Sequence, residues 1–269
     1  MKRLTLLACS AVLLAAGQLS ATLITFEQPD YSTTGGPGGT NSIVGQDGWT
    51  QSAGDPSGAE VSDTVAYAGS QSLYIHRDDS AAVTRVGRGG FTDINGQTGG
   101  SVDFYLQATR VDLTVNTLFY FGTSTTSTSA GAVFGIQGSE IRYYDGGTAT
   151  NTSGAGLVAG VWYHYTAVFD FDSPTRNYDL TVQSVGLSSG DAGYVDMTLN
   201  DLAFRNQAVN DVHSVMILSE MYHVDPSYHG YYIDNLAFNN VVPEPGSLAL
   251  LGFGGLLMLV RGRTTRVSR

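Results

Sequence analysis

The feature that most constrains the fold is an alternation of apolar and polar side chains along the middle of the chain. Residues 102–106 and 178–182 both place an apolar or aromatic side chain at every second position. Successive side chains of a strand point to opposite faces, so this pattern predicts strands with one buried face and one face toward water. Almost no apolar residues recur at helical spacing in the same region, which indicates an all-β domain.

Similar patterns predict strands elsewhere, separated by segments rich in glycine and serine. We expect further strands at residues 72–76, 111–121, 132–136, 140–144, 161–171, 214–220 and 231–238. Asp145-Gly146-Gly147 predicts a hairpin turn, whereas residues 32–40 and 123–131 hold little apolar surface and are predicted to be loops. About ten strands in one domain predict a two-sheet antiparallel β-sandwich, a jelly roll, with a closed barrel as the structural alternative.

The amino-terminal segment has the pattern of an export signal. Lys2 and Arg3 precede an apolar run and a stretch of small residues, which predicts a signal peptide over residues 1–21. The run is shorter than the roughly 20 residues that a membrane-spanning helix needs. Cys9 is the only cysteine, so the mature domain, residues 22–241, is predicted to contain neither a disulfide nor a reactive thiol.

Charge excludes several classes of function. The two terminal segments hold six of the 13 basic residues but only one of the 24 acidic residues, so the domain carries a net charge of about −16. Nucleic acid is therefore not an expected partner. Lys2 is the only lysine, which excludes a phosphate-loop lysine, a Schiff-base lysine and a lysine general base from the domain. An acidic surface is compatible with capture of divalent cations.

The carboxy-terminal tail, residues 242–269, combines a proline-rich motif, an apolar segment predicted to form one short hydrophobic helix, and a basic flank. These parts are Pro243, Glu244 and Pro245; residues 247–260; and Arg261 with Arg263. The tail closely resembles the PEP-CTERM sorting signal. That resemblance implies processing by signal peptidase and an exosortase in a Gram-negative bacterium, with transient anchoring in the inner membrane and the arginines on the cytoplasmic side. An anchor that is never processed and a buried core helix are the alternatives.

Three segments of the domain resemble a known group of folds. Residues 68–75, 160–169 and 232–238 are similar to strands of the concanavalin A-like and laminin-G-like jelly rolls and of carbohydrate-binding modules. The resemblance implies a two-sheet sandwich and, with the sorting tail, a cell-surface or extracellular-matrix protein that binds exopolysaccharide. A purely structural or protein-interaction module of the envelope is the alternative.

No familiar catalytic pattern is present in the sequence of the exported region. Its only glutamates are Glu27, Glu60, Glu140 and Glu220, and none belongs to a Glu-x-Asp-x-Glu motif of the glucanases that share this fold. The Tyr-x-Lys pattern of similar lyases is missing as well. Gly186, Ser188 and Gly190 match Gly-x-Ser-x-Gly, but no helical pattern follows them, as a nucleophile elbow would require. We expect a non-catalytic protein, with a glycan-active enzyme of unrecognised site as the second alternative.

One segment is dense in aromatic and imidazole side chains, which suit sugar binding because rings stack on pyranose faces while polar groups bind hydroxyls. The candidate ligand-binding residues are Tyr222, His223, Asp225, Tyr228, His229 and Tyr231. The alternative is that the tyrosines pack in the sandwich and the histidines are simply exposed. Trp162 is predicted to lie in the core, because it begins the longest apolar strand.

A metal site is the remaining prediction. Many carbohydrate-binding jelly rolls hold a structural calcium ion between their first and last strands, and the resemblance implies Ca²⁺ ligands at Glu27, placed in the first strand, and Asp234, placed in the last. The alternative is that both carboxylates cap or face solvent. Zinc is not expected, because the histidines lack a neighbouring cysteine and compact spacing. No other cofactor is predicted.

Overall fold

The computed structural model describes residues 20–34, 41–53, 58–76, 83–91, 94–95, 99–111, 115–152, 154–172, 174–221 and 230–240. The sorting motif, the basic flank, the apolar tail and nearly all of the predicted signal peptide lie outside these residues. Within the described part of the chain, no helix combines the length and hydrophobicity that crossing a membrane requires.

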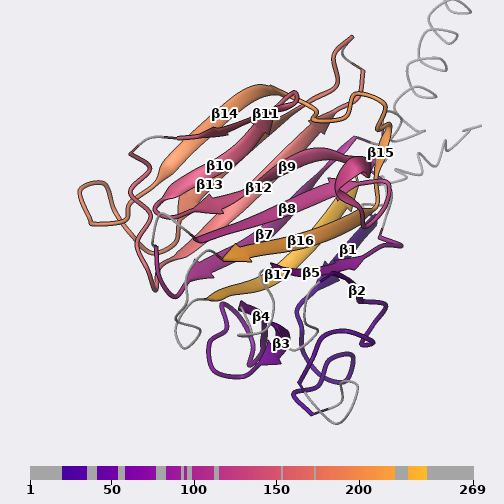
Figure 1. The fold of residues 1–269 in the computed structure, drawn as a ribbon. Coiled ribbons are helices and arrows are strands. Elements are labelled where there is room, and N and C mark those ends of the chain that lie inside the picture. The colour runs from indigo at the N-terminus through magenta and orange to yellow at the C-terminus, as the bar shows by residue number, and fades with distance from the viewer. Residues whose placement is uncertain are drawn as a thin grey trace, which may run out of the picture.

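Two large antiparallel sheets form the molecule (Figure 1). The eight-stranded sheet runs β14 (Asp196–Ala203), β13 (Asn177–Ser184), β12 (Trp162–Asp170), β7 (Gly100–Ala108), β17 (Gly230–Asn240), β4 (Ser72–His76), β3 (Ala59–Ser62), with β1 (Ser20–Ile24) beside β17. The seven-stranded sheet runs β11 (Thr148–Asn151), β10 (Glu140–Asp145), β9 (Ala130–Gln137), β8 (Val115–Gly122), β16 (Ser214–Met221), β5 (Val83–Arg88), β2 (Thr50–Ala53). A small pair, β6 (Ile94–Asn95) and β15 (Asp211–Val212), lies apart.

The predicted two-sheet sandwich is therefore confirmed, and the chain does not form the alternative closed barrel. The strand predicted at Ser72–His76 has those bounds, and the Gly146-Gly147 turn joins β10 to β11 as expected. One loop prediction was wrong at its end, because β9 begins at Ala130. Ala130 pairs with Gly122, and this cross-strand pairing extends β9 into a segment whose composition alone suggested a loop.

The core between the sheets is aromatic. Phe104 stacks on Phe119 from the opposite sheet and on Tyr165 from the neighbouring strand, with ring centroids 4.2 and 5.1 Å apart. The alternation predicted for β7 is confirmed, because Val102, Phe104 and Leu106 are buried while the residues between Val102 and Leu106 are partly exposed. The outward positions of these strands are therefore free to carry a functional surface.

The last strand ties the two ends of the described chain together. The first residues of β17 pair with β4 and its last residues pair with β1, while β7 runs along its other side. Ser20 pairs with Asn240 and Ala21 with Asn239, so the cleavage position predicted after Ala21 falls within β1. A three-residue 3₁₀ helix, Ser127–Ser129, directly precedes β9.

Candidate functional site

A row of polar and aromatic side chains crosses five strands on the outer face of the eight-stranded sheet. Cross-strand pairing places Glu60 opposite Tyr74, Tyr74 opposite Tyr232, Tyr232 opposite Gln107, and Gln107 opposite Trp162. Directly paired residues share one face of a sheet, so all five point away from the core. Strands lie about 4.8 Å apart, so the row is about 19 Å long.

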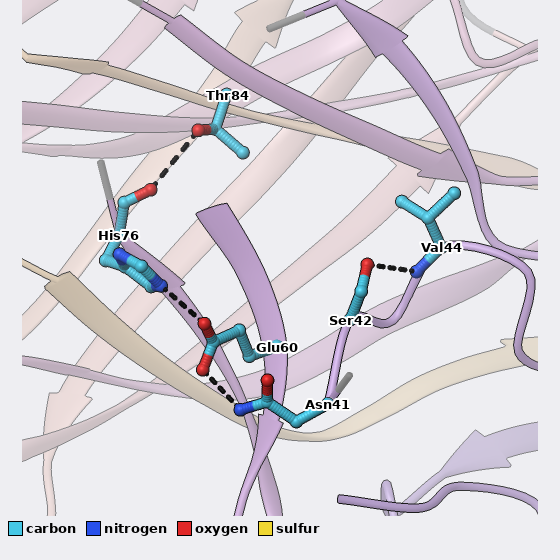
Figure 2. A network of polar contacts seen from close by, with 6 residues as sticks. All are labelled: Asn41, Ser42, Val44, Glu60, His76 and Thr84. Carbon is cyan, nitrogen blue, oxygen red and sulfur yellow. Dashed lines mark hydrogen bonds and ion pairs between the residues drawn. The ribbon is translucent and has the colours of Figure 1, made fainter. Parts of the chain in front are cut away.

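Glu60 lies at one end of this row in a polar network (Figure 2). Its Oε1 atom is 3.1 Å from Nε2 of His76, and the amide of Asn41 donates to its Oε2 atom. Burial alone would raise the pKa of Glu60, but the hydrogen bond and charge of His76 and the Asn41 amide outweigh it and lower that pKa. The carboxylate is thus held ionised beside an imidazole.

Asp103 and His164 form a second carboxylate–imidazole pair on the same face. Their Oδ1 and Nε2 atoms are 3.5 Å apart, and Asp103 also accepts hydrogen bonds from Thr166 (2.7 Å), Ser101 (2.9 Å) and Asn239 (2.9 Å). Burial would raise the pKa of Asp103, yet the bonds from His164, Thr166 and Ser101 lower it. Three neighbouring strands contribute to this pair, so its geometry depends on their register.

Aromatic rings accompany each pair. Tyr105 stacks between His164 and Tyr67, at centroid distances of 4.5 and 3.6 Å, and the edge of Trp162 approaches Tyr67 at 5.8 Å. Tyr74 stacks between His76 and Tyr232, at 5.0 and 4.6 Å. We call this surface the polar-aromatic face; its residues are Glu60, Tyr67, Tyr74, His76, Asp103, Tyr105, Gln107, Trp162, His164 and Tyr232.

The core position predicted for Trp162 was wrong. Trp162 is partly exposed, while its neighbour Tyr163 is buried at 1% exposure. The apolar length of the strand suggested burial, but the side chain of Trp162 pairs with outward-facing Gln107, and this register sets its direction.

Two carboxylates hold the loop that carries Tyr67. Oδ2 of Asp234 accepts bonds from the backbone N–H groups of Tyr67 (2.9 Å) and Ala68 (3.0 Å). Oε1 of Glu27 accepts bonds from the N–H groups of Ser70 (2.6 Å) and Gln71 (2.8 Å). Asp234 lies in the last strand as predicted, but Glu27 does not lie in the first, since β1 ends at Ile24.

In this structure the two predicted calcium ligands, Glu27 and Asp234, therefore bind backbone N–H groups of a loop. Backbone N–H donors converge on the oxygen atoms of both carboxylates. Such hydrogen bonds compensate the negative charge, and they do not leave the oxygens free for a cation. Among the described residues, no group of three or more histidine, cysteine, aspartate or glutamate side chains could hold a metal ion. The Ca²⁺ site implied by the resemblance and this hydrogen-bonding arrangement are alternatives, and the effect of calcium on thermal stability decides between them.

The residues of the predicted ligand segment are placed only in part. Tyr222, His223, Asp225, Tyr228 and His229 lie outside the described residues. Tyr231 is described, and it is buried in the core at 1% exposure, which leaves it no surface for a ligand. Its neighbour Tyr232 faces outward and belongs to the polar-aromatic face.

The sequence analysis did not single out the other residues of this face. Their signal was present in the polar half of the alternating strands, where Asp103, Tyr105 and Gln107 stand between apolar residues. These residues meet His164, Trp162 and Tyr232 because of the order in which the strands lie side by side in the sheet. No local sequence pattern contains that order.

By its fold, the chain is an antiparallel β-sandwich. No protein-family model matches it, and no curated protein matches it in sequence. A protein of unknown function from Shewanella oneidensis MR-1 is similar in shape, with 12% identity and a TM-score of 0.49 over 84% of this chain and 89% of that one.

Two further solved structures have a comparable likeness. A carbohydrate esterase from the Shiga toxin-encoding bacteriophage phi24B is 13% identical, with a TM-score of 0.47 over 82% of this chain and 100% of that one. A sialidase is 16% identical, with a TM-score of 0.46 over 71% of this chain, and the match spans 16% of the sialidase's length. Structural similarity at this level does not show what this chain binds.

Proposed function

We propose that this chain is a non-catalytic polysaccharide-binding protein and that the polar-aromatic face is its binding surface. The observation that carries the proposal is the combination, on one sheet face, of two carboxylates held ionised beside imidazoles with four partly exposed aromatic rings, those of Tyr67, Tyr74, Tyr105 and Trp162. Aromatic rings stack on the apolar faces of sugar rings, and carboxylates and imidazoles bind sugar hydroxyls.

The dimensions of the face favour a long ligand. Tyr74 and Trp162 stand three strands apart, a separation of about 14 Å, and lie on either side of Gln107 in the same row. A linear oligosaccharide can reach both ends of the row, whereas a single sugar residue cannot. The face therefore suits a chain-like polysaccharide, and the exopolysaccharide of the producing cell is the proposed partner.

The spacing of Glu60 and Asp103 supports a non-catalytic role, while Asp234 is fully buried and bound to the N–H groups of Tyr67 and Ala68. Glycoside hydrolysis needs two carboxyl groups roughly 5 to 9.5 Å apart across the scissile bond. Glu60 and Asp103 lie on β3 and β7, which β4 and β17 separate, so their strands are about 14 Å apart. Each carboxylate is also bound to a histidine and to further donors.

Electrophoresis of the full-length chain in gels containing the producer's exopolysaccharide tests this proposal. We expect mobility to fall as the polysaccharide concentration rises, and to remain unchanged in gels containing an unrelated inert polymer. Unchanged mobility in the exopolysaccharide gels from a folded protein would overturn the proposal. It would favour a structural envelope module, a candidate supported by the way the rings of the face stack on one another.

Export and sorting form a separate part of the proposal, supported by the signal-peptide pattern and by Pro243-Glu244-Pro245 with its apolar segment and basic flank. We propose that an exosortase recognises the motif and releases the domain to the cell surface or extracellular matrix. A carboxy-terminal epitope tag should be lost from the exported protein in cells with the exosortase. Retention of the tag in such cells would contradict this part alone.

A further inference from the structure

The outer face of the seven-stranded sheet has a different chemistry from the polar-aromatic face. A second hydrophobic cluster lies there, separate from the core, and its buried members are Leu118, Tyr120, Ala130, Val133, Met216 and Leu218. Leu118 and Leu218 are each only 3% exposed although they face away from the core. Neighbouring side chains therefore enclose the middle of this face.

Two arginines stand at the ends of one row that crosses this cluster. Cross-strand pairing gives the order Arg142, Gly135, Leu118, Leu218, Arg85 over β10, β9, β8, β16 and β5. Both arginines are partly exposed, whereas the two leucines between them are buried. The row therefore has an apolar centre with a guanidinium group on either side, about 19 Å apart along the sheet.

A third arginine lies over the adjacent row. The guanidinium carbon of Arg205 is 5.6 Å from the ring centre of Tyr120 and 5.4 Å from that of Tyr144. Arg205 also lines an open pocket of about 270 Å³ with Ser127, Thr128, Asn206 and Gln207. This pocket extends the cationic surface along one edge of the face.

Two of these arginines donate hydrogen bonds to uncharged groups. Arg142 donates to the side chain of Gln137, and Arg205 donates to the backbone carbonyl of Ser127. Within the described ranges, none of the three forms an ion pair, although Arg88 pairs with Asp47. Glu140 lies near Arg142 on the same face, connected to it through Gln137 and Asn151. The domain holds about 23 acidic residues and only seven arginines, so three arginines beside Glu140 give this face a large share of the domain's positive charge, which attracts an anion.

Unused hydrogen-bonding groups lie in the same place. Nε of Arg85, Nε of Arg142 and Oδ1 of Asn116 are buried and have no hydrogen-bond partner among the described residues. Asn116 itself is 4% exposed and adjoins the cluster on β8. Buried polar atoms in native proteins are nearly always paired, so these two donors and one acceptor are hydrogen-bonding capacity that the described residues leave unused.

We propose that this outer face of the seven-stranded sheet binds an acidic polysaccharide whose sugars carry carboxylates, through Arg85, Arg142 and Arg205. The planar guanidinium fork matches a carboxylate in two parallel hydrogen bonds, which is the reason arginine and not lysine suits this task. The face lies on the opposite side of the sandwich from the polar-aromatic face. A domain with both sites connects two polysaccharide strands.

Binding of polygalacturonate, neutral β-glucan and dextran sulfate to the detergent-purified full chain tests this inference. We expect polygalacturonate to bind, and Arg85→Gln combined with Arg142→Gln to weaken that binding at least tenfold while β-glucan binding stays unchanged. Arg110→Gln, which removes one positive charge from an exposed position two residues after β7, is the control, with affinity expected within twofold of the unchanged protein. Trp162→Ala should leave polygalacturonate binding intact, so failure here and failure at the polar-aromatic face are distinguishable.

The inference would be overturned by wild-type affinity for polygalacturonate in the double variant or by displacement of bound polygalacturonate by β-glucan. Dextran sulfate binding more tightly than polygalacturonate would also overturn the choice of a carboxylate ligand. If the double variant does not fold, salt provides a second measurement on the unchanged protein. About 0.5 M NaCl screens exposed charges strongly and should abolish polygalacturonate binding but not β-glucan binding; binding that survives this salt would contradict the proposed site.

Discussion

Glu27 and Asp234, which are 207 positions apart in the sequence, accept backbone hydrogen bonds from the two ends of one short loop, residues 67–71. The charge of Glu27 is near enough to raise the pKa of Asp234 further. The pair fixes the loop that places Tyr67 on Tyr105. Two residues from opposite ends of the domain therefore position a loop over the middle of the polar-aromatic face.

The first prediction concerns Asp234→Asn and pH. Burial raises the pKa of Asp234 to about 6, against the hydrogen bonds from Ala68, Asn235 and Tyr67, while the unfolded value is near 3.8. Between these values the folded state holds a proton that the unfolded state has lost, so this residue's contribution to stability falls as pH rises from about 4 to 6. The Asn variant should lack that slope.

Urea unfolding of both proteins at several pH values between 4 and 8 measures this difference. The free energy of unfolding of the variant minus that of wild type should increase as pH rises through the window and then level off, because only wild type loses stability there. A difference that is flat with pH would show that Asp234 is ionised throughout and that the three N–H groups outweigh burial.

Calcium gives the second prediction. Because both carboxylates already accept N–H hydrogen bonds, we expect the melting temperature to be the same in calcium chloride and in EDTA, within about 1 °C. Differential scanning calorimetry measures it, with magnesium as the control cation. A rise in melting temperature that Glu27→Gln abolishes would instead support the predicted Ca²⁺ clip between these residues.

Trp162→Ala should weaken polysaccharide binding with little loss of stability. Trp162 is partly exposed in the row of the polar-aromatic face, so its removal takes away a stacking surface, an effect of about 1 to 2 kcal/mol in binding. Val168→Ala is the matched control, because Val168 is 50% exposed on the same strand and the same face but lies away from the rings. Equal loss in both variants would contradict a binding role for Trp162.

Asp103→Asn should destabilise the domain by about 1 to 3 kcal/mol near neutral pH, because the carboxylate accepts bonds from four residues on three strands. Burial would raise the pKa of Asp103, but the bonds from His164, Thr166 and Ser101 outweigh it and lower that pKa below 3.8. Its contribution is therefore present above about pH 4 and lost as pH falls through the lowered value. Chemical unfolding at pH 7 and pH 3 should show the difference between variant and wild type shrinking at the lower pH.

Much of the fold was predictable because strand patterning is local. The alternation at residues 102–106 and 178–182 identified β7 and β13 and the faces that they bury. Short strands such as β2, β3 and β6 were missed, because two to four residues carry too little periodicity to stand out. Glu27 was assigned to the first strand because no local pattern marks the end of β1 at Ile24.

The sequence by itself determined that the chain is an all-β domain with polar residues on the outer faces of its strands, and it limited the catalytic chemistry available. Only the tertiary structure decided that Asp103 meets His164, that Glu60 meets His76, and that Trp162 faces outward. The reason is physical: the direction of each side chain follows from local backbone geometry, but its neighbours follow from strand order and register, which long-range packing between distant segments sets.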